Sequence, residues 1–95
     1  MARLDDDSVR ARLDDLPGWE LGSGEIVREY RLADFPAAVA FVVRVAFQAE
    51  AANHHPDLDL RYNRVRVALS THSEGGITDK DLELAAAIQE LENGQ

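Results

Sequence analysis

Residues 57–69 read DLDLRYNRVRVAL, and this stretch decides the fold. Apolar and polar residues alternate on both sides of Asn63 and Arg64, which is the pattern of two half-buried β-strands joined by a tight turn. If Asn63 and Arg64 form the two-residue loop, the facing pairs on one side of the hairpin are all apolar: Tyr62 with Val65, Leu60 with Val67, and Leu58 with Leu69. We therefore predict an antiparallel hairpin in this register.

The same register brings the histidines of the chain together. When it is extended, Thr71 lies opposite Pro56 and His72 lies opposite His55, beside His54. Imidazole is the side chain whose ordinary pKa lies nearest neutrality, so clustered histidines can exchange protons with a substrate. Glu50 lies one helical turn before His54 and could hold that imidazole in one tautomer. These residues form a candidate proton-transfer site.

The first third of the chain predicts a helix followed by another hairpin. Asp5 is placed to cap the helix, with Leu4 and Val9 as a hydrophobic staple. Residues 19–21 and 25–32 then read as two strands turned at residues 22–24. The pair Val27 and Arg28 breaks the alternation, which indicates either a bulge or an exposed Val27.

A last helix begins at Thr78, with Asp81 in the position of a capping-box acid. The element order is thus α-β-β-α-β-β-α, with hairpins in place of crossovers. This order predicts an α+β fold, in which a four-stranded, largely antiparallel sheet has helices packed on one face. We expect residues 1–95 to form a single domain.

The most apolar segment is the predicted helix over residues 35–50, for which Asp34 is the candidate N-cap. At helical spacing, one face carries Phe35, Val39, Val42, Ala46 and Ala49, while Phe41 and Val45 lie elsewhere on the cylinder. One sheet cannot bury a helix that is apolar on nearly every side. We expect a partner subunit or a second packed element around Phe41 and Val45; the alternative is the core helix of a monomer.

Charge and composition exclude several classes of function. The chain has 18 acidic and 10 basic side chains, a net charge of −8, so nucleic acid and anionic membranes are not expected as partners. It has no cysteine, which excludes disulfides, thiolate nucleophiles and cysteine-ligated zinc. The N-terminus lacks an apolar signal region and the apolar run over residues 36–43 is short, so we expect a soluble, cytoplasmic protein.

Several spacings then resemble a known family, the pterin-4a-carbinolamine dehydratases. The signature runs from Glu50 through His54-His55-Pro56, Tyr62 and His72 to Asp81. The resemblance extends to Gly18-Trp19, the RVAFQAE run of residues 44–50, and LSTH at residues 69–72, and so covers essentially the whole chain.

The resemblance implies the dehydration of 4a-hydroxytetrahydropterin to quinonoid dihydropterin, the step that recycles the cofactor of a pterin-dependent aromatic amino acid hydroxylase. It implies that His54 and His72 are the main acid/base pair and that His55 is an auxiliary or pterin-contacting group. It requires no metal and no cofactor, since the pterin is the substrate. It also implies a homodimer or homotetramer.

The resemblance also implies supporting roles for further residues. Glu50 and Asp81 are expected to support the histidines, with Asp81 orienting His72 or binding the pterin edge. Trp19, Thr71 and Pro56 are expected at the substrate, Trp19 as a flat surface for the ring. Asp81 is equally explained as a helix cap, and Trp19 as a core residue.

Other uses of the same residues stay open. A three-histidine metal site is the rival use of the cluster, but adjacent strand side chains diverge, so His54 and His55 would not easily hold one ion. The second functional class is a binding or dimerisation module on the same scaffold, or another role linked to pterin or molybdopterin. An intact histidine set favours the enzyme.

Overall fold

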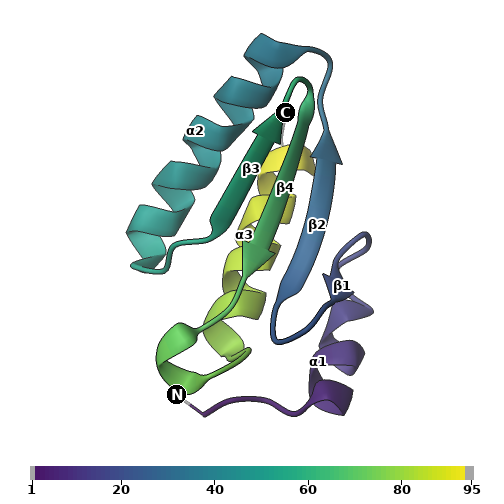
Figure 1. Cartoon of the computed structure of the whole chain (residues 1–95), viewed down its shortest axis with the longest axis vertical. Helices are drawn as coiled ribbons and strands as arrows, with labels where there is room; N and C mark the ends of the chain where they lie inside the picture. The colour runs from purple at the N-terminus through teal and green to yellow at the C-terminus, as the bar shows by residue number, and fades with distance from the viewer. Residues whose placement is uncertain (1, 94–95) are drawn as a thin grey trace.

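A computed structural model describes residues 2–93 of the chain, without the side chain of Asn93. Three α-helices, four strands and one short 3₁₀ helix follow one another (Figure 1). They are α1 (Asp6–Leu13), β1 (Glu20–Leu21), β2 (Ile26–Arg31), α2 (Phe35–Ala52), β3 (Asp57–Arg61), β4 (Arg64–Leu69), η1 (His72–Glu74) and α3 (Asp79–Asn93). The predicted order α-β-β-α-β-β-α is confirmed.

The helices begin where local capping chemistry allows them to begin. The Asp5 carboxylate accepts a hydrogen bond from the Ser8 amide at 2.8 Å, and Asp34 accepts one from the Ala37 amide at 2.9 Å. Each bond satisfies an amide that has no partner within the first helical turn. Both predicted N-caps are therefore confirmed.

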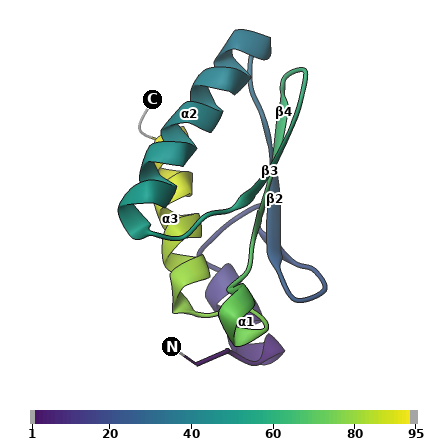
Figure 2. The same ribbon diagram turned by 60° about the vertical axis from the view of Figure 1, so that its left-hand side comes forward.

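The four strands form one antiparallel sheet in the order β1-β2-β4-β3. Figure 2 shows the sheet nearly edge-on, with α2 and α3 on the same side of it. The core lies in this layer between sheet and helices, where Ile26, Tyr30, Val65, Val67 and Leu69 meet Phe41, Val45 and Ile88. The predicted α+β architecture is thus the observed one.

The pairing of β2 with β4 runs without interruption from Ile26 opposite Leu69 to Arg31 opposite Arg64. No bulge interrupts the described strand at Val27. Arg28 instead points to the same side as Ile26 and Tyr30, where its guanidinium lies 4.2 Å from the Tyr30 ring centroid. Its charge is met there by Glu92 at 3.1 Å.

The hairpin of β3 and β4 differs from the predicted register by two residues. Leu60 pairs with Val65, and the loop consists of Tyr62, at φ 52°, and Asn63. The cause is a tertiary contact: the Asn63 side chain donates to the Leu32 carbonyl at 3.1 Å, and the Leu32 amide donates to the Asn63 carbonyl. A shift of two residues keeps every side chain on its face, so the apolar pattern could not distinguish the two registers.

The predicted extension of this hairpin to His72 is also wrong. The β4 strand ends at Leu69, and Thr71 forms a bridge with Gly76 in place of Pro56. His72 begins the 3₁₀ helix η1, with an exposed side chain. The ladder therefore does not place His72 opposite His55.

The face of α2 that enters the core is not the predicted one. Its buried residues are Ala38, Phe41, Val45 and Ala49, whereas its large exposed apolar residues are Phe35, Val39, Val43 and Phe47. Because the helix is apolar nearly all round, the sequence gives no clear stripe. Packing selects the side on which Phe41 lies 4.7 Å from the Tyr30 ring.

Helix α2 is also long and apolar enough, at 18 residues, to cross a membrane by length and composition. The core helix of a folded domain meets the same criteria. Here Phe41 and Val45 are packed against the sheet, and Arg44 and Glu50 interrupt the other sides. These contacts favour a core helix.

Candidate active site

The site begins where α2 ends. Asn53 caps the helix in the left-handed conformation, φ 51°, and the His54 amide donates to the Ala49 carbonyl at 3.1 Å. Such a C-cap satisfies the last carbonyls of the helix and reverses the chain. The reversal turns the His54 side chain toward the start of α3.

Asp81 in the first turn of α3 receives that side chain. The Nε2 atom of His54 lies 2.5 Å from Oδ1 of Asp81. The other carboxylate oxygen accepts hydrogen bonds from the Thr71 hydroxyl at 2.7 Å and from the Thr78 amide at 2.9 Å. Asp81 is completely buried, and these partners compensate its lost hydration.

The hydrogen-bond network fixes the direction of each proton. The Thr71 hydroxyl gives its proton to Asp81, so Thr78 must donate in the 2.8 Å bond between the two hydroxyls. The oxygens of an ionised Asp81 only accept, and Nε2 of His54 is then the donor to Oδ1. The Nδ1 atom of His54 is left as the nitrogen that can exchange a proton with a ligand.

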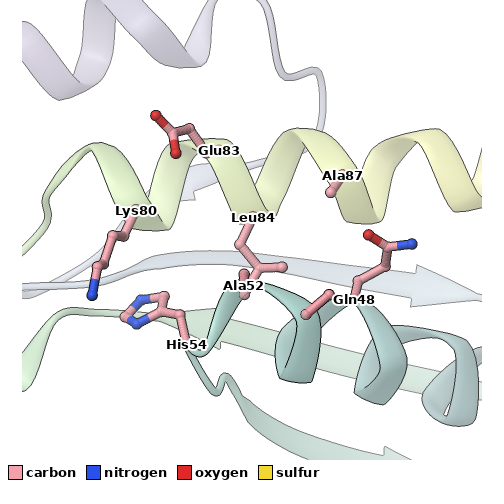
Figure 3. Close-up of a pocket in the computed structure, with 8 residues that line it drawn as sticks. Gln48, Ala52, His54, Lys80, Glu83, Leu84 and Ala87 are labelled. Atoms are coloured by element: carbon pink, nitrogen blue, oxygen red, sulfur yellow. The ribbon is translucent and has the colours of Figure 1, made fainter.

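A pocket of about 390 Å³ opens beside this histidine. Its lining comes from the end of α2 and the start of α3: Gln48, Ala51, Ala52, His54, Lys80, Glu83, Leu84 and Ala87. Figure 3 shows Lys80 extending from α3 toward His54, and beside them Leu84 of α3 points toward Ala52 of α2. Polar groups thus surround an apolar cleft.

The carboxylate partners of the histidines differ from those predicted. Glu50 contacts His55, at 3.0 Å, and not His54; both side chains are exposed. The helix ends at Ala52, so the one-turn spacing from Glu50 does not continue to His54. Asp81 contacts His54 and not His72. The capping role of Asp81 was predicted, and one carboxylate performs both tasks.

The remaining predicted residues lie at different depths. Thr71 is buried beneath the site, where it binds Asp81. His72 follows it directly in the chain and is exposed, and Pro56 is half-buried. Trp19 is 4 % exposed and packs edge-on against Tyr30, with ring centroids 6.3 Å apart. The structure therefore places Trp19 in the hydrophobic core, as the alternative interpretation held.

The family of the chain follows from comparison with known proteins. The sequence model of pterin 4 alpha carbinolamine dehydratase matches residues 2–91. The chain belongs to this family. A relative from Chloroflexus aurantiacus (strain J-10-fl), provisionally named pterin-4-alpha-carbinolamine dehydratase, is 59% identical over 91 residues, which are 96% of this chain and 98% of the relative. One of the same provisional name from Acidobacterium capsulatum is 53% identical, over 96% of this chain and 99% of the relative.

Two solved structures share the fold of this chain. A Brucella melitensis protein described as a transcriptional coactivator/pterin dehydratase superposes with a TM-score of 0.86 at 38% identity, over 90% of this chain and 94% of that one. A pterin dehydratase-like protein identified as a RuBisCO assembly factor of the alpha-carboxysome has a TM-score of 0.67 at 17% identity, over 78% and 88% of the two chains. The second likeness shows the fold alone.

The pocket residues Gln48 and Lys80 were not predicted as site residues of this dehydratase-family chain. Lys80 gives no signal of its own beyond its position before Asp81, and Gln48 lies within the RVAFQAE run. Only the approach of α2 to α3 brings them together. Within residues 2–93, no group of three or more histidine, aspartate or glutamate side chains is arranged to hold a metal ion.

Proposed function

We propose that this protein removes water from 4a-hydroxytetrahydropterin and gives quinonoid dihydropterin. The observation that carries the proposal is the contact of His54 with the buried Asp81 at the edge of the pocket. Membership of the pterin dehydratase family supplies the substrate class. Together they connect a defined proton-transfer group with a chemistry that needs one.

The reaction requires two proton transfers and no electron acceptor. The hydroxyl on C4a leaves as water once it receives a proton, and the electron pair of N5 expels it. The proton on N5 passes to a base, and a C4a–N5 double bond results. An acid and a base near neutral pH perform both transfers, and each contributes typically about 10²–10⁴-fold to the rate. We therefore propose no cofactor and no metal.

His54 and His72 are the proposed acid/base pair. His54 presents Nδ1 to the ligand because Asp81 occupies Nε2. His72 is exposed, and the residue before it in the chain, Thr71, binds the same Asp81 through its hydroxyl. His55, paired with Glu50 at the surface, is the proposed auxiliary group.

The pocket suits a bicyclic ring with polar edges. Its volume of about 390 Å³ falls at the lower end of the range for small-molecule sites. Leu84 and Ala52 offer apolar contact to the ring, and Lys80, Glu83 and Gln48 can bond its polar atoms. We assign the pterin to this pocket and not to Trp19.

From the same family membership we also propose where the protein acts, which reaction it follows and how its subunits assemble. The protein would act in the cytoplasm and return the product of a pterin-dependent aromatic amino acid hydroxylase to the cofactor cycle. We further propose a homodimer or homotetramer that buries the exposed apolar residues of α2, Phe35, Val39, Val43 and Phe47. The interface predicted around Phe41 and Val45 is not available, because both residues are buried in the core of the subunit.

A binding module without catalysis is the second candidate. This candidate is favoured by the description of the similar Brucella melitensis protein as a transcriptional coactivator as well as a pterin dehydratase. The two functions are distinguished by following 4a-hydroxytetrahydropterin, generated by a hydroxylase, with and without the protein. Faster decay with the wild type, and not with His54→Ala/His72→Ala, supports the enzyme; unchanged decay supports the binding module.

A further inference from the structure

The outer face of the sheet, opposite α2 and α3, carries three arginines in one row. Arg31 of β2 lies opposite Arg64 of β4, and Arg61 of β3 lies opposite Arg64 from the other side. Their neighbours along the strands point into the layer between sheet and helices, so the arginines point away from it. All three are exposed.

This row does not favour folding. Like charges directly opposite one another across strands are destabilising. Facing Cα atoms are about 4.5–5.5 Å apart, so the row extends over about 10 Å. Arg61 pairs with Asp59 at 3.1 Å, but among residues 2–93 Arg31 and Arg64 have no ion-pair partner. Unpaired cations are unexpected in a chain of net charge −8.

The neighbouring row narrows the class of ligand. Glu29, Arg66 and Asp59 face one another there, and a hollow of about 270 Å³ is lined by these three with Arg61 and Arg64. A long phosphate polymer laid across the sheet would meet both carboxylates and the net negative charge. A short segment with a few carboxylates carries less charge against this repulsion, and it avoids Glu29 and Asp59 because it can occupy the arginine row alone.

We propose that this face is a docking surface for an acidic segment of another protein, whose carboxylates bind Arg31, Arg64 and Arg61. Guanidinium groups match carboxylates in bidentate geometry, which gives strong and directional bonds. The acids Glu29 and Asp59 beside the row would reject a segment with further negative charges there. The proposal is independent of the dehydratase reaction, since the row lies on the face opposite the helices that form the pocket.

The test is a nuclear magnetic resonance titration of the full, ¹⁵N-labelled chain with a short peptide in which every second residue is glutamate. The matched peptide has glutamine at the same positions. The signals followed are the backbone amides and the Nε–H groups of the arginines. The variant is Arg31→Gln/Arg64→Gln, and the control is Arg10→Gln/Arg12→Gln, which removes two charges from α1.

The glutamate peptide should shift the Nε–H signals of Arg31, Arg61 and Arg64 in a saturable way, and the glutamine peptide should not. The variant should bind roughly tenfold more weakly or worse, with an unchanged dehydration rate, while the control keeps the wild-type affinity. Absence of saturable shifts, or equal losses in variant and control, would overturn the proposal. Tighter binding of an oligothymidylate at the same salt concentration would overturn the assigned class of partner.

Discussion

The Nε2 atom of His54 lies 2.5 Å from Oδ1 of Asp81, and this contact joins the residue after the C-cap of α2 to the first turn of α3. The same carboxylate receives the Thr78 amide as a helix cap. One buried residue thus sets the start of α3 and the orientation of the proposed catalytic imidazole. The dehydration rate and the integrity of the helix cap should therefore both depend on Asp81.

Replacing Asp81 by asparagine should lower the dehydration rate by roughly 10²-fold, the low end for a group involved in acid/base catalysis. The asparagine amide can present its NH₂ group to His54. The contact then no longer fixes Nε2 of His54 as the donor. The pH dependence of kcat/KM should shift as well, which loss of a structural contact alone would not cause. Stopped-flow absorbance over a pH series measures both.

Asp79→Asn is the matched control for this change. Asp79 lies in the same helical turn and pairs with Arg12 at the surface, at 3.0 Å. It should retain the wild-type rate and pH profile. Equal loss of rate in the two variants would show that the helix terminus matters and that the contact with His54 does not.

Replacing His72 by alanine should lower the rate by about 10² or more while the fold persists. The side chain is exposed at the start of η1, so the free energy of unfolding should change by less than about 0.5 kcal/mol. Urea unfolding and the circular dichroism spectrum measure the second quantity. Ser73→Ala, its exposed neighbour, is the control. A change of unfolding size in the spectrum would identify His72 as structural.

Stability should fall in alkaline solution because of Tyr30. Burial raises the pKa of this phenol from 10.0 to about 12, against the smaller opposing effect of the Arg28 charge. Above pH 10 the unfolded chain releases its phenolic proton and the folded chain retains it, so unfolding becomes more favourable. Between pH 10 and 12 the difference should reach about 2–3 kcal/mol.

Urea unfolding at several pH values in this window measures the effect, and Tyr30→Phe is its control. The variant lacks the hydroxyl that bonds Gln89 at 3.0 Å, and it should lose the part of the pH dependence that Tyr30 contributes. The other tyrosine, Tyr62, lies exposed in the turn between β3 and β4. The same slope in both proteins would rule out Tyr30 as the cause.

The proposed oligomer should dissociate when a charge enters the exposed face of α2. Phe47 is 71% exposed in the single chain, so Phe47→Glu should leave the subunit folded and lower the mass measured by sedimentation equilibrium. Ala11→Glu, on the exposed side of α1, should not. A wild-type protein that sediments as a monomer at all concentrations would contradict the proposed assembly.

Elements set by local chemistry could be predicted from the sequence. The caps Asp5 and Asp34 and the capping box of Thr78 and Asp81 depend on residues at most three positions apart, so their signals lie within short windows. The alternation of β4 likewise shows its core face. These features determine the order of elements and hence the fold class.

Features set by tertiary contacts could not be predicted. The hairpin register depends on the bond of Asn63 to Leu32, and the buried side of α2 depends on the approach of Phe41 to Tyr30. The partner of His54 depends on how the left-handed Asn53 turns the chain toward α3. In each case the sequence allows two arrangements of similar hydrophobic pattern, and contacts between distant residues select one.

The most direct test of the proposed dehydration is the decay of hydroxylase-generated 4a-hydroxytetrahydropterin, followed by ultraviolet absorbance with wild-type protein and with His54→Ala/His72→Ala. The wild type should accelerate the decay, and the folded double variant should not. Acceleration by both would contradict the role of these histidines. A decay unchanged by the wild-type protein would contradict the dehydratase itself.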